Sequence, residues 1–185
     1  MLVRRVIIIL NIFIMTFLTG GCTGKTEEKA LQDAVNNYNR TLKVVLRTGD
    51  VSLLNNVALE NEVRRMELFL TYMNEEKKVL SAELDSIKFI SAQVDNDQGK
   101  AVADESPNKG NKQAKQAATA KKQRAKEPTA QVKTEEIWTY EYLHPETGAK
   151  IEGPFLIKYN TTYKLIKRDR WKVYEVSFKE QVLKR

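Results

Sequence analysis

The order of hydrophobic and polar positions divides the chain into a helical part followed by a strand part. Between residues 26 and 48, apolar residues recur three and four positions apart, which places them on one face of a helix. These residues are Leu31, Val35, Tyr38, Leu42 and Val45. Thr26 can cap this helix at its start and Gly49 suits its C-terminal cap. A short helix over 51–55 and a longer helix over 58–73 follow.

From residue 79 onward the apolar positions alternate with a period of two, which is typical of β-strands. The alternation through Leu84 resumes out of phase at Ile87, so a β-bulge is predicted near residues 85–86. A final strand is expected from Trp171 to Phe178. The remaining strands are expected over 100–103, 137–142 and 155–165. Turns are expected at 95–99 and 168–170, and a hairpin loop at 144–148. Helices followed by an antiparallel sheet predict an α+β fold.

The first residues have the pattern of an export signal. Arg4 and Arg5 precede an apolar run over residues 6–18, and small residues lead to Cys22, the single cysteine of the chain. The run is shorter than the roughly 20 residues that span a bilayer core, so an uncleaved anchor is the less favoured alternative. The stretch from Leu18 to Cys22 resembles the lipobox of bacterial lipoproteins, which implies a diacylglycerol on Cys22. The other alternative is an ordinary secreted protein with an incidental cysteine.

The positive charge of the chain, formally +7, is concentrated in one segment. Residues 106–132 form a low-complexity stretch rich in Lys, Ala and Gln, for which we expect disorder because it has little to bury. It is interpreted as a solvated loop or as a contact to anionic lipid headgroups or envelope polymers. Nucleic acid is not an expected partner, because no aromatic residue lies between the basic ones to stack on bases. The candidate contacts are Lys109, Lys112, Lys115, Lys121, Lys122, Arg124 and Lys126.

These observations predict the organisation of the chain. We expect a signal peptide over 1–21 and a lipidated N-terminus with a short tether over 22–25. One α+β domain is then formed by residues 26–105, with its helices and first strands, and residues 133–185, with its last strands. The insertion 106–132 lies between the two parts.

Three parts of the chain resemble the nuclear transport factor two superfamily, and one of them, the strand around residues 137–142, fits between the other two. The stretch from Leu46 to Leu54 is similar to its helix–turn–helix opening, and the stretch from Tyr163 to Phe178 is similar to its last hairpin, with Trp171 opening the final strand. The resemblance implies a sheet that curls around helices into a cone. It does not define an activity, because the superfamily includes enzymes, carriers and noncatalytic interaction domains.

Aromatic residues are the main candidates for a binding surface. They alternate along predicted strands and would either line a cleft or fill the core: Trp138, Tyr140, Tyr142, Tyr159, Tyr163 and Trp171. Two polar residues are the alternatives for a catalytic role: His144, expected in a solvated hairpin loop, and Asp85, expected at the bulge. The sequence has no HExxH, CxxC or glycine-rich phosphate loop, so no catalytic residue, cofactor or metal is predicted.

The sequence therefore favours a noncatalytic binding or assembly module of the cell envelope, held on a membrane by lipid on Cys22. Its expected partner is an envelope protein or an anionic envelope polymer. The alternative is a small-molecule carrier or enzyme that uses the interior of the cone. A cavity with two or more convergent polar groups would favour that alternative, and a shallow or filled cone would favour the module. A purely structural envelope protein would show neither a cavity nor a large exposed apolar patch.

Overall fold

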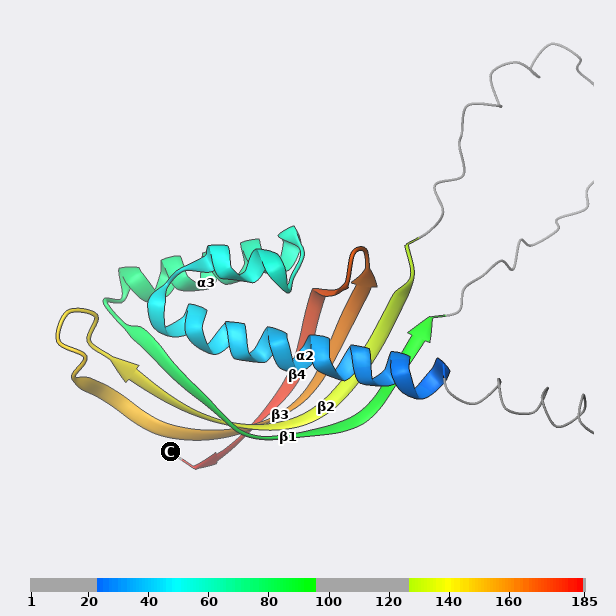
Figure 1. The fold of residues 1–185 in the computed structure, drawn as a ribbon. Coiled ribbons are helices and arrows are strands. Elements are labelled where there is room, and N and C mark those ends of the chain that lie inside the picture. Colours follow the sequence, from blue (N-terminus) through cyan, green and yellow to red (C-terminus); the bar gives the residue numbers. More distant parts are fainter. Residues whose placement is uncertain (1–22, 96–126, 185) are drawn as a thin grey trace, which may run out of the picture.

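The computed structural model describes residues 23–95 and 127–184, and it confirms the predicted α+β class. Helical elements come first along the chain and four strands follow (Figure 1). The elements are α2 (Thr23–Thr48), the 3₁₀-helix η1 (Val51–Asn56), α3 (Glu60–Glu75), β1 (Val79–Asp95), β2 (Thr129–Leu143), β3 (Lys150–Lys167) and β4 (Trp171–Lys184). The predicted signal peptide over 1–21, Cys22, the predicted strand over 100–103 and the seven basic residues from Lys109 to Lys126 lie outside the described residues.

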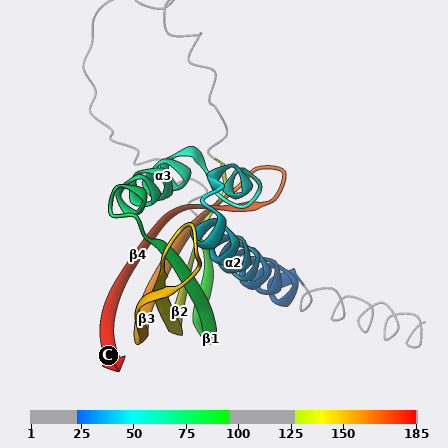
Figure 2. The same cartoon turned by 90° about the vertical axis from the view of Figure 1, so that its left-hand side faces the viewer.

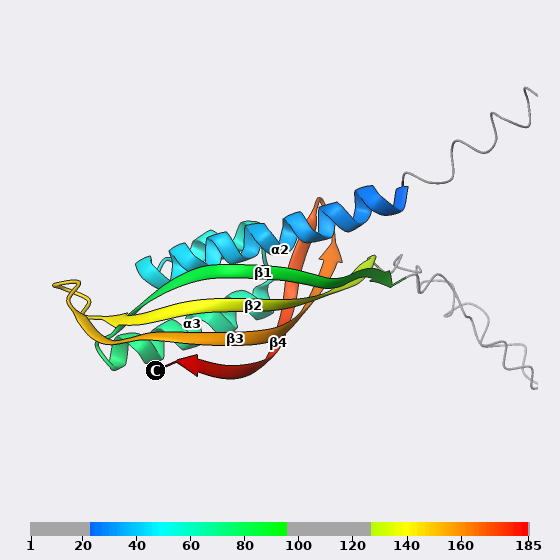
Figure 3. The same ribbon diagram turned by 90° about the horizontal axis from the view of Figure 1, so that it is seen from below.

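The four strands form one antiparallel sheet in the order β1-β2-β3-β4. The sheet curves strongly, and both α2 and α3 lie on its concave side (Figures 1 and 2). The register shifts between Leu84 and Ser86, which confirms the predicted bulge, and again between Tyr140 and Tyr142 on β2. A bulge bends its strand and increases the local twist, so these irregularities account for part of the curvature. The strand order is plain from the convex side (Figure 3).

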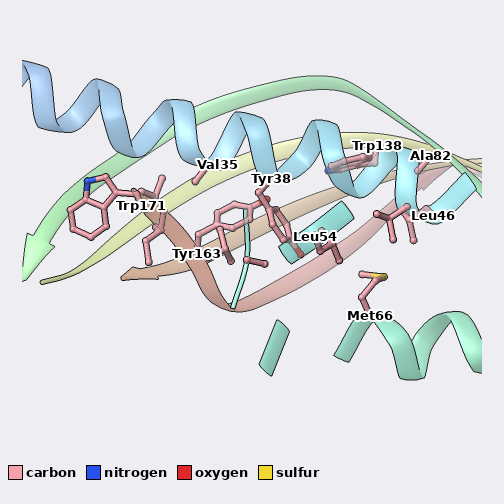
Figure 4. Packing of buried hydrophobic residues seen from close by; sticks show 14 of the residues in the cluster. Val35, Tyr38, Leu46, Leu54, Met66, Ala82, Trp138, Tyr163 and Trp171 are labelled. Atoms are coloured by element: carbon pink, nitrogen blue, oxygen red, sulfur yellow. The ribbon is translucent and has the colours of Figure 1, made fainter. Parts of the chain in front are cut away.

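The core lies between α2 and the sheet. The predicted apolar face of α2 is buried there, with Leu31, Val35, Tyr38 and Val45 at most 1% exposed. Figure 4 shows Tyr38 and Tyr163 next to each other beneath the helix. Their rings meet edge to face with centroids 5.9 Å apart. No helix within residues 23–95 or 127–184 is both long and apolar enough to cross a membrane.

The segment between η1 and α3 attaches the helices to the edge strand β4. Gly49 ends α2 with a φ of 76°, and the Asp50 side chain accepts a hydrogen bond from the Ser52 amide at the start of η1. Further on, Ala58 forms a parallel bridge with Val173, and the Leu59 amide donates to the Val173 carbonyl over 2.8 Å. Because Ala58 is held in this bridge and Leu59 is extended, α3 begins at Glu60 and not at the predicted residue 58.

Several further boundaries differ from the predictions, among them the start of β3 at Lys150 instead of residue 155. Helix α2 begins at Thr23, so Thr26 lies inside the helix and is not its cap. Strand β2 begins at Thr129, so residues 129–132 belong to the sheet and not to the low-complexity insertion. Ala130 and Val132 point into the core there, a short alternation that the surrounding composition conceals. Strand β4 continues beyond Phe178 to Lys184, whereas the predicted turns at 144–148 and 168–170 are confirmed.

Candidate functional site

A groove opens between the helices and the concave face of the sheet. Its volume is about 330 Å³. The helices supply Leu42, Leu46, Arg65, Met66 and Phe69, and the strands supply Leu80, Tyr140, Tyr142, Phe155, Ile157, Tyr159, Phe178 and Glu180. We call this set the groove. Three of the six aromatic residues predicted as a binding surface, Tyr140, Tyr142 and Tyr159, line it.

The floor of the groove is a continuous array of aromatic rings. Tyr140 stacks on Trp138 with centroids 5.9 Å apart, and Tyr159 meets Tyr140 and Phe178 edge to face at 6.3 and 5.1 Å. At the outer end, Tyr142 packs edge to face on Phe155 at 6.0 Å. Alternate residues of a strand share one face of a sheet, so neighbouring strands bring these rings together. The exposed parts of these rings offer an apolar surface for a ligand.

A smaller cavity of about 90 Å³ adjoins the groove. It shares five lining residues with the groove: Leu42, Arg65, Tyr140, Tyr159 and Phe178. It adds Tyr38, Asn39, Glu136, Trp138, Thr161, Tyr163 and Val176. We call it the inner cavity. Polar groups are concentrated here, under α2, whereas the groove is mainly aromatic and aliphatic.

Glu136 is the central polar residue of the inner cavity. Its side chain is only 2% exposed, and its two carboxylate oxygens accept hydrogen bonds from three neighbours. Thr134 Oγ1 and Tyr163 Oη donate to Oε1 over 2.6 and 2.7 Å, and Trp138 Nε1 donates to Oε2 over 2.9 Å. A buried carboxylate is stable only when such partners replace water. Glu136 is therefore held in place and its acceptor capacity is largely used.

A second buried carboxylate, Glu62 on α3, is neutralised within its own helix. Arg65 donates to it through Nε over 2.9 Å and through Nη2 over 2.5 Å. Tyr38 Oη of α2 also donates to Glu62 Oε1. The hydrogen bonds to Glu62 raise the pKa of Arg65 above its ordinary value. This trio fixes α3 against α2 and leaves Arg65 as a paired cation at the edge of the groove.

Four tyrosines of the site keep their hydroxyl protons at neutral pH, because each has a raised pKa: Tyr38, Tyr140, Tyr159 and Tyr163. Burial raises the pKa of Tyr38, Tyr140 and Tyr163, and the nearby carboxylates Glu62 and Glu136 act in the same direction. Burial is also the main cause of the raised pKa of Tyr159. These groups can donate and accept hydrogen bonds, but they are not bases.

Asn39 is the one buried side chain among the described residues with an unpaired polar atom. It is 1% exposed and lines the inner cavity. Its Oδ1 lies 3.0 Å from Tyr163 Oη, whose single hydrogen is shared between Asn39 and Glu136. Its Nδ2 has no hydrogen-bond partner. Native proteins contain few such groups, so this one calls for an explanation.

The other predicted candidates lie away from the groove. Trp171 is 6% exposed and sits at the far end of the core, where Nε1 donates to Glu27 Oε1 over 2.9 Å (Figure 4). His144 lies in the β2–β3 hairpin and accepts a hydrogen bond from the Glu146 amide. Asp85 is exposed at the bulge and accepts from Thr139, so it does not point inward. No group of three or more possible metal ligands occurs in the described part of the chain.

The polar residues in and beside the inner cavity were not among the site residues predicted from the sequence. A signal for Glu136 was present, because it lies in phase with the inward-facing Trp138 and Tyr140. Glu62 likewise lies four residues before the buried Met66, on the inner face of α3. No pattern within the sequence pointed to Asn39, since its partner Tyr163 is 124 residues away.

A larger hollow of about 460 Å³ is bounded by the end of α2, the second half of α3 and the start of β1. None of the predicted aromatic residues lines it. We therefore place the candidate site in the groove and the inner cavity.

Comparisons with known proteins support the fold alone. No protein-family model matches the sequence, and no curated protein is significantly similar to it. Among solved structures, the chain is similar to the crystal structure of the intermembrane space region of the chloroplast protein ARC6. The TM-score is 0.56 at 13% sequence identity, over 83% of this chain and 97% of that one. At this identity the similarity establishes a shared arrangement of helices and curved antiparallel sheet, and nothing about activity.

Proposed function

We propose that the protein is an envelope lipoprotein whose α+β domain is a noncatalytic binding or assembly module, with the groove as its contact surface. The observation that carries the proposal is the open aromatic groove, beside which the two buried carboxylates, Glu62 and Glu136, already have hydrogen-bond donors. An apolar segment of a partner would displace water from Tyr140, Tyr142, Tyr159 and Phe178. Burial of apolar and aromatic surface is the main source of affinity at such sites.

The chemistry of the described residues argues against catalysis. Glu136 accepts three hydrogen bonds, Glu62 is paired with Arg65, and the tyrosines hold their protons. A general base needs a free acceptor within reach of the substrate proton. The one histidine of the chain, His144, lies in a hairpin outside the groove.

The alternative is a small-molecule carrier or enzyme that uses the interior of the cone. It is favoured by one observation, the convergence of Asn39, Glu136 and Tyr163 on the inner cavity. The two functions differ in what fills the site. A partner chain would cover the open groove from outside, whereas a small ligand would be contained within the groove and the inner cavity.

Membrane attachment is the second part of the proposal. It rests on the basic start, the short apolar run and the small residues before Cys22. Two or more acyl chains at one residue suffice for stable anchoring without a spanning helix. We also propose that the domain belongs to the nuclear transport factor two superfamily, and the curved sheet around α2 and Trp171 at the start of the last strand support this. The ARC6 region is, by its title, a region of an intermembrane space, which is compatible with an envelope role but does not establish one.

The contact surface can be tested by crosslinking in native membranes. Phe178 is 49% exposed and lines the groove, whereas Tyr72 is 58% exposed on α3 outside it. We expect Phe178→Ala to abolish a discrete crosslinked product that wild type and Tyr72→Ala both give. Equal products from all three chains would place the contact elsewhere.

Metabolic labelling with a fatty-acid probe tests the lipid anchor. Cys22→Ser is expected to stay unlabelled and unprocessed, and label on that variant would contradict the lipoprotein assignment.

A further inference from the structure

We propose that the inner cavity binds a neutral carbonyl group of an apolar ligand, and that Asn39 Nδ2 donates the hydrogen bond that recognises it. The inference rests on the proposed function, because the body of such a ligand would lie in the groove. It adds the chemical class that the site selects. The carbonyl can belong to a small molecule or to a peptide group of a partner chain.

The first step is the state of Asn39. Its side chain is 1% exposed, and Nδ2 has no protein acceptor within reach. Leaving a buried amide hydrogen unpaired is unfavourable, and a leucine of similar shape would avoid it. The sequence nevertheless has asparagine at this position, facing a cavity. A ligand acceptor in that cavity would complete the hydrogen bonding of Nδ2.

The second step is the continuity of the space. The inner cavity and the groove share Tyr140, Tyr159 and Phe178, so one molecule can occupy both. Its polar end would reach Asn39 and its apolar part would lie on the aromatic floor. Apolar sites with a few placed polar groups are the usual form of ligand pockets.

The third step is charge. Glu136 faces the inner cavity as a buried carboxylate, and the nearest cation, Arg65, is paired with Glu62. A carboxylate or phosphate on the ligand would be repelled by Glu136 without a free cation to offset the repulsion. A neutral acceptor such as a ketone, ester or amide carbonyl avoids that penalty.

The test uses a probe of this class, 6-propionyl-2-(dimethylamino)naphthalene, a neutral aromatic ketone whose emission moves to longer wavelength when its carbonyl accepts a hydrogen bond. The full chain is titrated as wild type, as Asn39→Leu, and as Asn37→Leu, the same change at an exposed position of α2. We expect Asn39→Leu to weaken binding at least about fivefold, the equivalent of one net hydrogen bond. It should also shift the bound emission to shorter wavelength, whereas Asn37→Leu should match wild type.

A second probe separates this inference from the proposed function. N-phenyl-1-naphthylamine has an apolar body and no carbonyl, so it should bind wild type and Asn39→Leu equally. If neither probe binds wild type, this inference is refuted, whereas the proposed function is decided separately by the crosslinking of Phe178→Ala. If the ketone binds wild type and Asn39→Leu alike, only the role of Asn39 is refuted. If Asn39→Leu loses binding of the amine probe but keeps binding of the ketone, Oδ1 and not Nδ2 faces the cavity, and the assignment of Nδ2 as the donor is overturned.

A measurement on the wild-type chain removes any dependence on the variant's folding. The side-chain amide of Asn39 gives its own pair of signals in a ¹H–¹⁵N spectrum, assigned through its contact with Tyr163. Addition of the ketone should shift these signals downfield, as expected for a new acceptor on Nδ2. Signals that stay in place at saturating ketone would contradict the proposal.

Discussion

Replacement of Trp171 by alanine should damage the fold itself. The indole is 6% exposed at the start of β4, and Nε1 donates to Glu27 over 2.9 Å. Lys167 Nζ lies 5.4 Å from the ring centroid and also pairs with Glu27. A large aromatic side chain buries about 150–250 Å². At about 25 cal/mol per Å², that area corresponds to roughly 4–6 kcal/mol, of which the alanine methyl retains a part.

We therefore expect Trp171→Ala to lower the free energy of unfolding by about 3–5 kcal/mol, a large share of the stability of a domain. Trp171→Phe keeps most of the buried area and loses the bond to Glu27, so it should lose less. Equilibrium urea unfolding, followed by circular dichroism and by the fluorescence of the buried Trp138, measures both. His144→Ala should be nearly silent and serves as the matched surface change. Native stability in Trp171→Ala would mean that the indole is not a core anchor, and the reasoning from its burial would be refuted.

Three further predictions follow from the fold. Burial raises the pKa of Tyr38, Tyr140 and Tyr163 above the ordinary 10.0, so the folded chain should lose stability as the pH rises above 10, where the unfolded chain releases these protons. The ultraviolet absorbance of tyrosinate should then appear together with the loss of circular dichroism. Full ionisation of these tyrosines in an intact fold would contradict the prediction. Gly153→Ala should destabilise the chain by more than about 1 kcal/mol in urea unfolding, because the φ of Gly153 is 100° and a Cβ would lie 2.7 Å from the Tyr140 carbonyl oxygen. Gly148→Ala is the control and should cost less, because a Cβ at that position meets no atom within 4 Å. Deletion of residues 106–126 should lower stability by less than about 2 kcal/mol, because the segment has almost nothing to bury, and a larger fall in the thermal unfolding midpoint would show that it docks on the core.

The periodicity of apolar positions was sufficient to predict the elements, because each element buries one face. The stripe from Leu31 to Val45 defined α2, and the phase change at Ile87 located a bulge that the register confirms. Boundaries were less predictable where a contact distant in sequence decides them. Residues 57–59 have helical neighbours but pair with β4.

The candidate site could be predicted only in part. Trp138, Tyr140, Tyr159 and Tyr163 share one face of the sheet, yet Trp138 and Tyr163 are buried whereas Tyr140 and Tyr159 line the open groove. That difference depends on which part of the sheet the helices cover, and a strand pattern does not contain this information. Glu136 was overlooked because a glutamate is expected to face water, although three donors offset its burial.

The two ends of the domain differ in the segments that they carry. Helix α2 starts beside the end of β1, and Glu27 and Glu127 contact Lys167 and Arg168 at this same pole, whereas the β2–β3 hairpin lies at the other (Figure 1). The 26 residues of α2 extend over about 39 Å. An acylated Cys22 and a cationic segment between residues 95 and 127 would thus act as two attachments at one pole, each raising the effective concentration of the other at a bilayer. The outer end of the groove would then project away from the lipid, within reach of a partner that is not itself membrane-bound.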